Sequence, residues 1–313
     1  MTFRNARVRA AYTFGCISEQ ALFAGSLQDD DDWRAGCVSL VSSAPVSFAH
    51  PRMTPRTPIE SSREPVIEFR HVHYTLSNRE LLNDVSFSVA RGETLVLLGR
   101  SGAGKTTALK MINRLLVPTS GEVLVEGELT TEWDPIALRR KIGYVIQDIG
   151  LFPHYTVSQN ISLIPRLERW PADRVRERVK EMLETVGLHG KTFEHRYPHQ
   201  LSGGQRQRVG VARALAADPD ILLMDEPFGA LDPMTRGEMQ NEFKTLELQL
   251  GKTVVIVTHD VGEALVLGTR IGLMEAGKLA RVYSPHDFVH AFDPMAAAYM
   301  AQLRVYDEAK GEK

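Results

Sequence analysis

The chain has 313 residues, which is enough for one large domain or two ordinary domains. Hydrophobic residues make up 43 % and charged residues 24 %, proportions that exclude a fibrous chain or one that is disordered throughout. The 37 basic and 39 acidic residues give a net charge of −2, so the strongly positive balance of a dedicated nucleic-acid-binding protein is missing. We therefore expect no nucleic-acid partner.

The sequence also argues against membrane insertion, export and disulfide bonding. No apolar run approaches the roughly 18 residues that span a bilayer, and the best candidates, such as residues 221–224 and 254–257, have the length of strands. Cys16 and Cys37 are the only cysteines, which excludes a disulfide framework and fits a reducing compartment. Glu19 interrupts what would have to be the apolar core of a signal peptide. We expect no export signal.

Residues 1–64 differ in composition from the rest of the chain. Residues 29–32 are four consecutive aspartates, and prolines punctuate the Ser/Thr-rich stretch that follows. Such a composition resists a packed core, so we expect a disordered extension. Met53, just before the first patterned segment, is a plausible alternative translation start. The folded domain is expected over residues 65–300, with a tail at residues 301–313.

From residue 65 onward, strand and helix patterns alternate. The segments 66–69 and 85–89 alternate apolar and polar residues, and the continuous apolar run 94–98 leads into a helical stretch over residues 108–116. A charged segment at about 153–190 contains an amphipathic helical run and indicates a helical insertion. The later runs 221–224 and 254–257 are fully apolar, as strands buried on both faces of a parallel sheet are. The order predicts an α/β fold.

Residues 99–106 read Gly-Arg-Ser-Gly-Ala-Gly-Lys-Thr and fit the pattern G-x-x-x-x-G-K-[ST]. The motif lies between the predicted strand 94–98 and a predicted helix, which is the context that the mechanism requires. Its glycines let backbone N–H groups face an anion, and the helix start adds a positive end. Lys105 is expected to reach the terminal phosphates of a nucleotide, and Thr106 to bind Mg²⁺.

Two carboxylates, Asp225 and Glu226, directly follow the apolar strand 221–224. Buried charge is costly unless it has a partner or a task. Asp225 is suited to hold Mg²⁺, and Glu226 to orient and deprotonate an attacking water. His259 follows the strand 254–257, and a lone histidine there is more often structural. The carboxyl ends of parallel strands, however, are where doubly wound sheets bind ligands.

Residues 201–205, Leu-Ser-Gly-Gly-Gln, precede a second helical run, and Ser202 is available to cap it. Two exposed glycine N–H groups make this a second anion-binding helix start. One nucleotide has no obvious need for two such sites in one chain. The second site therefore points to the nucleotide of another chain.

With these motifs in order, residues 66–300 resemble the ATP-binding cassette subunits of membrane transporters. Within the resemblance, residues 99–106 are similar to the Walker A motif, residues 221–226 to Walker B and residues 201–205 to the signature motif. Gln147 is similar to the Q-loop glutamine, residues 230–232 to the D-loop and His259 to the switch histidine. The resemblance implies a P-loop NTPase cassette with a mainly parallel core sheet, an antiparallel β subdomain and a helical subdomain at about residues 148–215.

The resemblance also implies roles for individual residues and the cofactors ATP and Mg²⁺. The catalytic residues are Glu226, His259 and Gln147, and the Mg²⁺ ligands are Thr106, Gln147 and Asp225. ATP is bound by Gly99, Arg100, Ser101, Gly102, Ala103, Gly104, Lys105, Thr106, Thr107 and Tyr74. In a head-to-tail homodimer, the ATP of one subunit meets the signature motif of the other, which is Leu201, Ser202, Gly203, Gly204 and Gln205. The D-loop residue is Asp232.

One element departs from the family pattern. The aromatic residue that stacks on adenine is expected near position 76, where this chain has Leu76, and Tyr74 is the nearest aromatic. Residues two apart on a strand share a face, so either Tyr74 contacts adenine or Leu76 holds it by apolar contact. His71 and His73 also share a strand face, but without a third ligand nearby we do not expect them to bind a metal.

Residues 109–115, 138–147 and 150–167 resemble the glycine betaine, carnitine and choline importers. The resemblance implies a membrane permease and an extracytoplasmic solute-binding protein as partners, with this subunit at the cytoplasmic face of the cell membrane. Many relatives carry a pair of CBS domains after the cassette, and the short stretch after Met300 leads us to expect none here. Regulation by salt or nucleotides through such domains is then either absent or located in another chain.

Two alternatives remain open at this point. The same cassette would serve an importer of amino acids or methionine, because the solute is selected in other subunits. Cassette ATPases of DNA repair or translation are a different class. Those relatives typically carry two cassettes, zinc-binding cysteines or a long coiled coil between Walker A and the signature. This chain has one cassette and only a helical insertion between Lys105 and Ser202.

Overall fold

The computed structural model describes residues 64–311. The disordered extension expected over residues 1–64, with the alternative start at Met53, therefore lies outside the described residues except for Glu64. In the part of the chain that is described, no helix is both long enough and apolar enough to cross a membrane.

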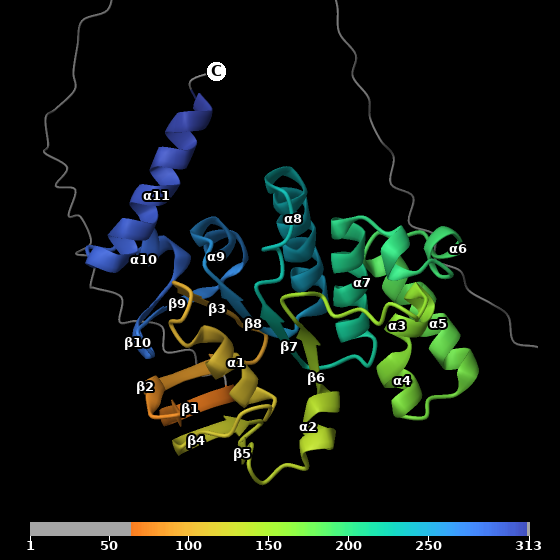
Figure 1. The fold of residues 1–313 in the computed structure, drawn as a ribbon, viewed down its shortest axis with the longest axis horizontal. Helices are drawn as coiled ribbons and strands as arrows, with labels where there is room; N and C mark the ends of the chain where they lie inside the picture. Colours follow the sequence, from red (N-terminus) through yellow and green to blue (C-terminus); the bar gives the residue numbers. More distant parts are fainter. Residues whose placement is uncertain (1–63, 312–313) are drawn as a thin grey trace, which may run out of the picture. The chain divides into compact units, whose positions relative to one another are not determined.

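The larger of two sheets has six strands in the order β10-β9-β3-β8-β7-β6 (Figure 1). All neighbours are parallel except β10, which runs antiparallel to β9. The three central strands are buried along their whole length, as their continuous apolar sequences predicted. The strands are β3 (Thr94–Gly99), β6 (Ile142–Val145), β7 (Ile221–Asp225), β8 (Thr253–Thr258), β9 (Arg270–Glu275) and β10 (Lys278–Tyr283).

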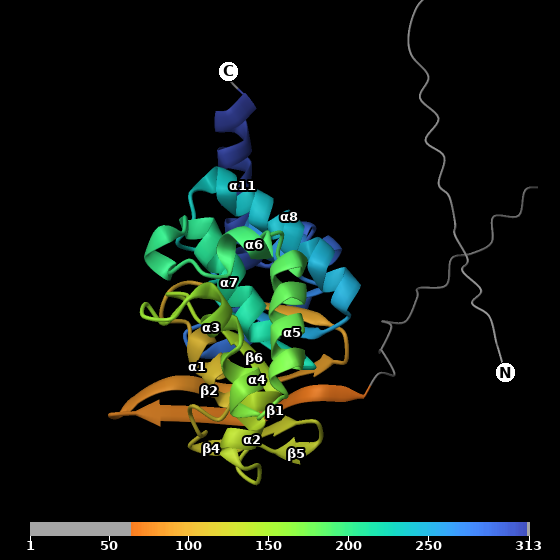
Figure 2. The ribbon, with the colours of Figure 1, turned by 90° about the vertical axis from the view of Figure 1, so that its right-hand side faces the viewer.

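A second, antiparallel sheet has the order β2-β1-β4-β5. Its strands are β1 (Pro65–Leu76), β2 (Arg79–Ala90), β4 (Ser120–Val125) and β5 (Glu128–Leu129). Helix α1 (Lys105–Ile112) lies between the two sheets (Figure 2), because Leu109 belongs to the same apolar core as Val85 and Val123 of this sheet and Leu97 of the larger one. Successive strand residues face opposite sides, so Val96 joins the core on the other face.

That second core is covered by the remaining long helices. A group of helices lies beyond β6 and corresponds to the helical subdomain expected at about residues 148–215 (Figure 1). It contains α3 (Val157–Ile161), α4 (Leu163–Leu167), α5 (Ala172–Thr185), α6 (Gly190–Phe193), the 3₁₀ helix η1 (Pro198–Gln200) and α7 (Gly203–Leu215). The other helices are α2 (Pro135–Lys141), α8 (Pro233–Leu250), α9 (Val261–Leu267), α10 (Pro285–Val289) and α11 (Pro294–Gly311).

The structure confirms the α/β class, the mainly parallel core sheet, the antiparallel sheet and the helical group. It corrects the end of the first helix, which stops at Ile112 instead of Leu116. The amides of Leu115 and Leu116 both bond back to the Lys110 carbonyl, and Arg114 has a positive φ of 53°. The chain turns there to reach β4, and this turn ends the helix although apolar residues continue in the sequence.

Candidate functional site

The loop between β3 and α1 wraps around its own lysine. Gly104, the residue before α1, has φ +96°, and a Cβ there would lie 2.7 Å from the Leu81 carbonyl oxygen, so only glycine fits. Lys105 is 5 % exposed, and its Nζ donates to the carbonyl oxygens of Gly99 (2.7 Å) and Arg100 (3.0 Å). The loop therefore holds a cation at the amino-terminal end of a helix, where an anion is favoured.

Burial shapes the electrostatics of this lysine. Loss of hydration lowers the pKa of Lys105, while the nearby carboxylates Glu226 and Asp225 act in the opposite direction. A buried ammonium whose hydration is replaced only in part by carbonyl oxygens is a strong attractor for further negative charge. The phosphate groups of a nucleotide supply such charge.

Thr106 and Asp225 bring oxygen atoms together from two elements. Thr106 Oγ1 on α1 donates to Asp225 Oδ1 at the end of β7 over 2.8 Å. Asp225 is 4 % exposed, and burial raises its pKa, opposed by the Thr106 hydroxyl and by Lys110. Magnesium is usually held by one or two carboxylates and hydroxyls together with substrate phosphates, so this donor set fits Mg²⁺ beside a nucleotide.

Glu226 follows Asp225 and is held by groups from two further strands. Its Oε2 lies 3.3 Å from His259 Nδ1 and accepts from Gln147 Nε2 over 3.4 Å. The Glu226 side chain is 18 % exposed, whereas that of His259 is 54 % exposed. Glu226 also has φ +44°, a strained value for a residue with a Cβ, and its amide donates to the Val257 carbonyl. The strained backbone directs the carboxylate to the sheet edge where His259 and Gln147 meet it.

A cavity of about 770 Å³, called the phosphate-loop cavity below, lies over the loop between β3 and α1. Arg100, Ser101, Gly102, Ala103 and His259 line it, so it brings together five residues predicted from the sequence. The opposite wall was not predicted and consists of Met274, Glu275, Ala276, Pro294, Met295, Ala298 and Tyr299. No local motif marks these residues, because β9 and α11 reach the loop only through tertiary packing.

The motif at residues 201–205 forms the start of α7, where Ser202 caps the helix as predicted. The Ser202 hydroxyl accepts from the Gln205 amide (3.2 Å), and the Gln205 side chain accepts from the Ser202 amide (3.0 Å). Ser202, Gly204 and Gln205 line a different cavity, of about 300 Å³, and none of residues 201–205 lines the phosphate-loop cavity. The loop before α1 and the start of α7 thus border different cavities of the chain.

Asp232 begins α8 in a similar way. Its Oδ1 accepts from the amides of Met234 (3.2 Å) and Thr235 (3.1 Å), and Pro233 occupies the first helical position. The hydrogen bonds from Thr235 lower the pKa of the Asp232 carboxyl. The Asp232 carboxylate therefore caps the amino-terminal end of α8.

Comparison with known proteins gives the family of the chain. The family described as "ABC transporter" matches residues 82–229. The "Glycine betaine uptake system ATP-binding protein YehX" of Escherichia coli (strain K12) is 48 % identical over 235 residues, covering 72 % of this chain and 76 % of that protein. The chain belongs to the ABC transporter family.

The cassette has further relatives of the same kind. The "Glycine betaine/carnitine/choline transport ATP-binding protein OpuCA" of Bacillus subtilis (strain 168) is 53 % identical over 211 residues. That match covers 67 % of this chain and 55 % of the relative, so the chain spans about half the length of such relatives. The solved ATP-binding cassette MJ0796, a dimer in a post-hydrolysis state bound to ADP and Pi, is 36 % identical with a TM-score of 0.63. That match covers 70 % of this chain and 98 % of the solved one.

The candidates for adenine contact lie on β1 of the cassette. Tyr74 faces Leu82 on β2 and packs against the apolar core, while Leu76 ends the strand and is 55 % exposed. Neither residue lines the phosphate-loop cavity. The choice between them stays a prediction.

Both β1 histidines have acidic neighbours. His71 Nδ1 lies 2.7 Å from Asp84 Oδ1, and His73 Nδ1 lies 3.5 Å from Glu80 Oε1. Each imidazole thus faces one carboxylate on the adjoining strand β2.

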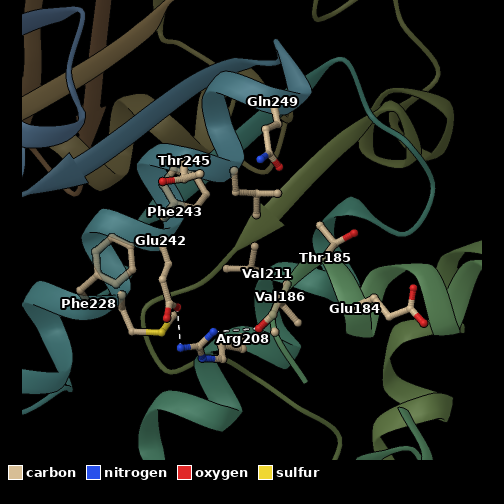
Figure 3. Close-up of a pocket in the computed structure, with 13 residues that line it drawn as sticks. Glu184, Thr185, Val186, Arg208, Val211, Phe228, Glu242, Phe243, Thr245 and Gln249 are labelled. Carbon is tan, nitrogen blue, oxygen red and sulfur yellow. Dashed lines mark hydrogen bonds and ion pairs between the residues drawn. The ribbon is translucent and has the colours of Figure 1, made fainter. Parts of the chain in front are cut away.

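Another cavity, of about 370 Å³, lies between the end of α5, α7 and α8 (Figure 3). Arg208 on its wall donates to the Val186 carbonyl over 2.9 Å and pairs with Glu242 over 2.5 Å. None of the predicted site residues lines this cavity, although Phe228 follows Glu226 by two positions. Its walls come from the end of α5, from α7, from α8 and from the loop at residue 228.

Proposed function

We propose that this cassette binds and hydrolyses ATP as the ATPase subunit of an importer for an osmoprotectant of the glycine betaine, choline or carnitine type. One observation carries the ATPase part. Three charged side chains lie at one edge of the larger sheet: Lys105 beyond the end of β3, and Asp225 and Glu226 at the end of β7. His259, which follows the strand β8 between them, and Gln147 both contact Glu226. Ligands of doubly wound sheets bind at this edge.

Each group has a task in phosphoryl transfer to water. Lys105 binds the terminal phosphates, and the loop N–H groups hold the oxygens as negative charge develops. Glu226 accepts a proton from the attacking water at its carboxylate, while His259 and Gln147 orient that carboxylate. Thr106, Asp225 and Gln147 would hold Mg²⁺, which supplies positive charge beside the phosphate oxygens.

We further propose a head-to-tail homodimer. Residues 201–205 of one subunit would complete the nucleotide site of the other, because in each protomer they border a cavity separate from the phosphate loop. A helix start with exposed amides suits the terminal phosphates of a partner's ATP. The dimeric form of the solved relative supports this arrangement.

The remaining partners are a membrane permease and a solute-binding protein, and the subunit would lie at the cytoplasmic face of the membrane. An apolar cavity of about 340 Å³ between β6 and the helical group, with Leu115, Tyr144, Phe152 and Ile164 on its walls, suits a helix of the permease. The solute rests only on the printed names of the relatives and on the resemblance around residues 142–167, because it need not touch this chain.

Uptake in cells that lack this gene tests the solute. We expect accumulation of labelled glycine betaine, choline or carnitine under osmotic stress to be lost and to return with the intact gene, but not with Lys105→Ala. Normal uptake of all three compounds with a failure of methionine or another amino acid would reassign the solute and leave the transport class. If the purified chain neither binds nor hydrolyses ATP, the ATPase proposal is wrong.

A further inference from the structure

Both neighbours of His259 are tied to other elements, although the imidazole itself is half exposed. Thr258 is 1 % exposed, and its hydroxyl donates to the buried Glu263 Oε2 of α9 over 2.9 Å. The Asp260 amide donates to the same hydroxyl over 3.0 Å, and Asp260 Oδ1 accepts from the Glu263 amide over 3.2 Å. The His259 loop is thus fixed to the start of α9 on one side.

Arg236 fixes the other side. It lies in the first turn of α8, and its Nη1 contacts Asp260 Oδ2 over 3.4 Å. Its Nη2 donates to the Leu231 carbonyl oxygen over 3.0 Å. One guanidinium therefore joins the loop at residues 230–232 to the loop that carries His259. The Nδ1 atom of His259 lies 3.3 Å from Glu226 Oε2.

We propose that Arg236 is a positioning residue for ATP hydrolysis, holding the His259 loop in register with the loop at residues 230–232 through Asp260. The proposal rests on the proposed ATPase function. Side chains of Arg236 and Asp260 are 29 % and 32 % exposed, and an ion pair that is partly exposed contributes little to folding stability. What the guanidinium provides is geometry, because its planar fork reaches a carbonyl and a carboxylate in two directions at once.

Substitution of Arg236 in the full-length chain tests this role. Arg236→Ala should lower kcat for ATP about 10- to 100-fold, the size expected for a displaced catalytic group, with KM for ATP changed less than about twofold. Arg236→Lys keeps the positive charge but can reach only one of the two partners, the Asp260 carboxylate or the Leu231 carbonyl. Its kcat should therefore lie between that of Arg236→Ala and that of the parent. In a His259→Ala background, Arg236→Ala should have no further effect on kcat, because it acts through that histidine.

Arg270→Ala is the matched control. Arg270 likewise bonds one carbonyl, Ser88 O (3.1 Å), and one carboxylate, Glu93 Oε1 (2.9 Å), but at the opposite end of the strands. The kcat of Arg270→Ala for ATP should equal that of the parent. An equal loss in Arg270→Ala, a rise in KM at constant kcat, or a full additional loss in the His259→Ala background would overturn the proposal.

A second measurement does not need ATP turnover and therefore separates this proposal from the ATPase assignment. Amide hydrogen exchange in the full chain without nucleotide should become faster at Asp260 and Glu263 in Arg236→Ala, and stay unchanged in Arg270→Ala. Unchanged exchange at both amides would show that Arg236 does not hold this loop. Faster exchange in a chain that hydrolyses no ATP would retain the loop contact and reject the proposed function.

Discussion

Glu226 Oε2 and His259 Nδ1 lie 3.3 Å apart, at the ends of two adjacent parallel strands. The same oxygen accepts from Gln147, which follows a third strand, β6. One carboxylate oxygen is therefore oriented from two sides. We expect the other carboxylate oxygen to take the proton from water.

Glu226→Gln should bind ATP normally and lose turnover by about 10²- to 10⁴-fold, because an amide keeps the shape and the contacts but cannot take the proton. The kcat for ATP and the affinity from a direct titration, measured on the same preparation, check this. Dimers should accumulate in ATP. Hydrolysis at the parent rate in the assembled transporter would show that Glu226 is not the base.

Lys105→Ala should instead weaken nucleotide binding. The variant removes the ammonium that we propose to bind the terminal phosphates, and the loop carbonyls of Gly99 and Arg100 lose their donor. Loss of a charge-assisted contact of this kind costs about 1.5 to 3 kcal/mol, or roughly 10- to 150-fold in affinity. Isothermal titration with ATP checks it, and unchanged affinity would contradict the role assigned to Lys105.

The sequence predicted the parts of the site that are built from consecutive residues. The loop at residues 99–106 and the Asp225–Glu226 pair each follow an apolar run, and their neighbouring positions at one sheet edge follow from the parallel strands. The Tyr299 wall of the phosphate-loop cavity and the contact of Arg236 with Asp260 were not predicted. Both join segments far apart in the chain, and their geometry depends on how helices α8, α9 and α11 pack on the sheet.

Replacement by alanine should lower the free energy of unfolding at Gly143 and raise it at Gly237. A Cβ at Gly143 in β6 would lie 2.6 Å from the Ala214 carbonyl of α7, so Gly143→Ala forces the strand and the helix apart. Such overpacking costs about 1 to 3 kcal/mol. A Cβ at Gly237 in α8 meets nothing within 4 Å, so Gly237→Ala should stabilise the helix by about 0.5 to 1 kcal/mol.

Thermal unfolding of both variants checks this pair. At about 2 to 4 °C per kcal/mol for a domain of this size, the midpoint should fall for Gly143→Ala and rise for Gly237→Ala. Equal midpoints for the two variants would mean that β6 and α7 are packed less closely than the structure describes.

The last prediction concerns Glu263, which is 3 % exposed. Burial raises the pKa of its carboxyl from the ordinary 4.5 to about 8. The hydrogen bond from Thr258 and the charge of Arg236 lower this pKa, whereas the negative charges of Asp260 and Glu226 raise it further. The folded protein thus keeps a proton on Glu263 at pH values where the unfolded chain has lost it. The stabilisation linked to this group is complete below about pH 4.5 and is lost as the pH rises toward 8.

Glu263→Gln should remove that pH dependence, because the amide still accepts from the Thr258 hydroxyl and cannot ionise. The free energy of unfolding in urea should fall with pH between about 5 and 8 more steeply in the parent than in the variant. The difference in slope is at most about 1.4 kcal/mol per pH unit. Glu132→Gln, which removes an exposed carboxyl, measures the effect of the charge change alone. If the parent and Glu263→Gln differ by the same free energy at pH 5.5 and pH 8, the Glu263 carboxyl is not held protonated by its surroundings.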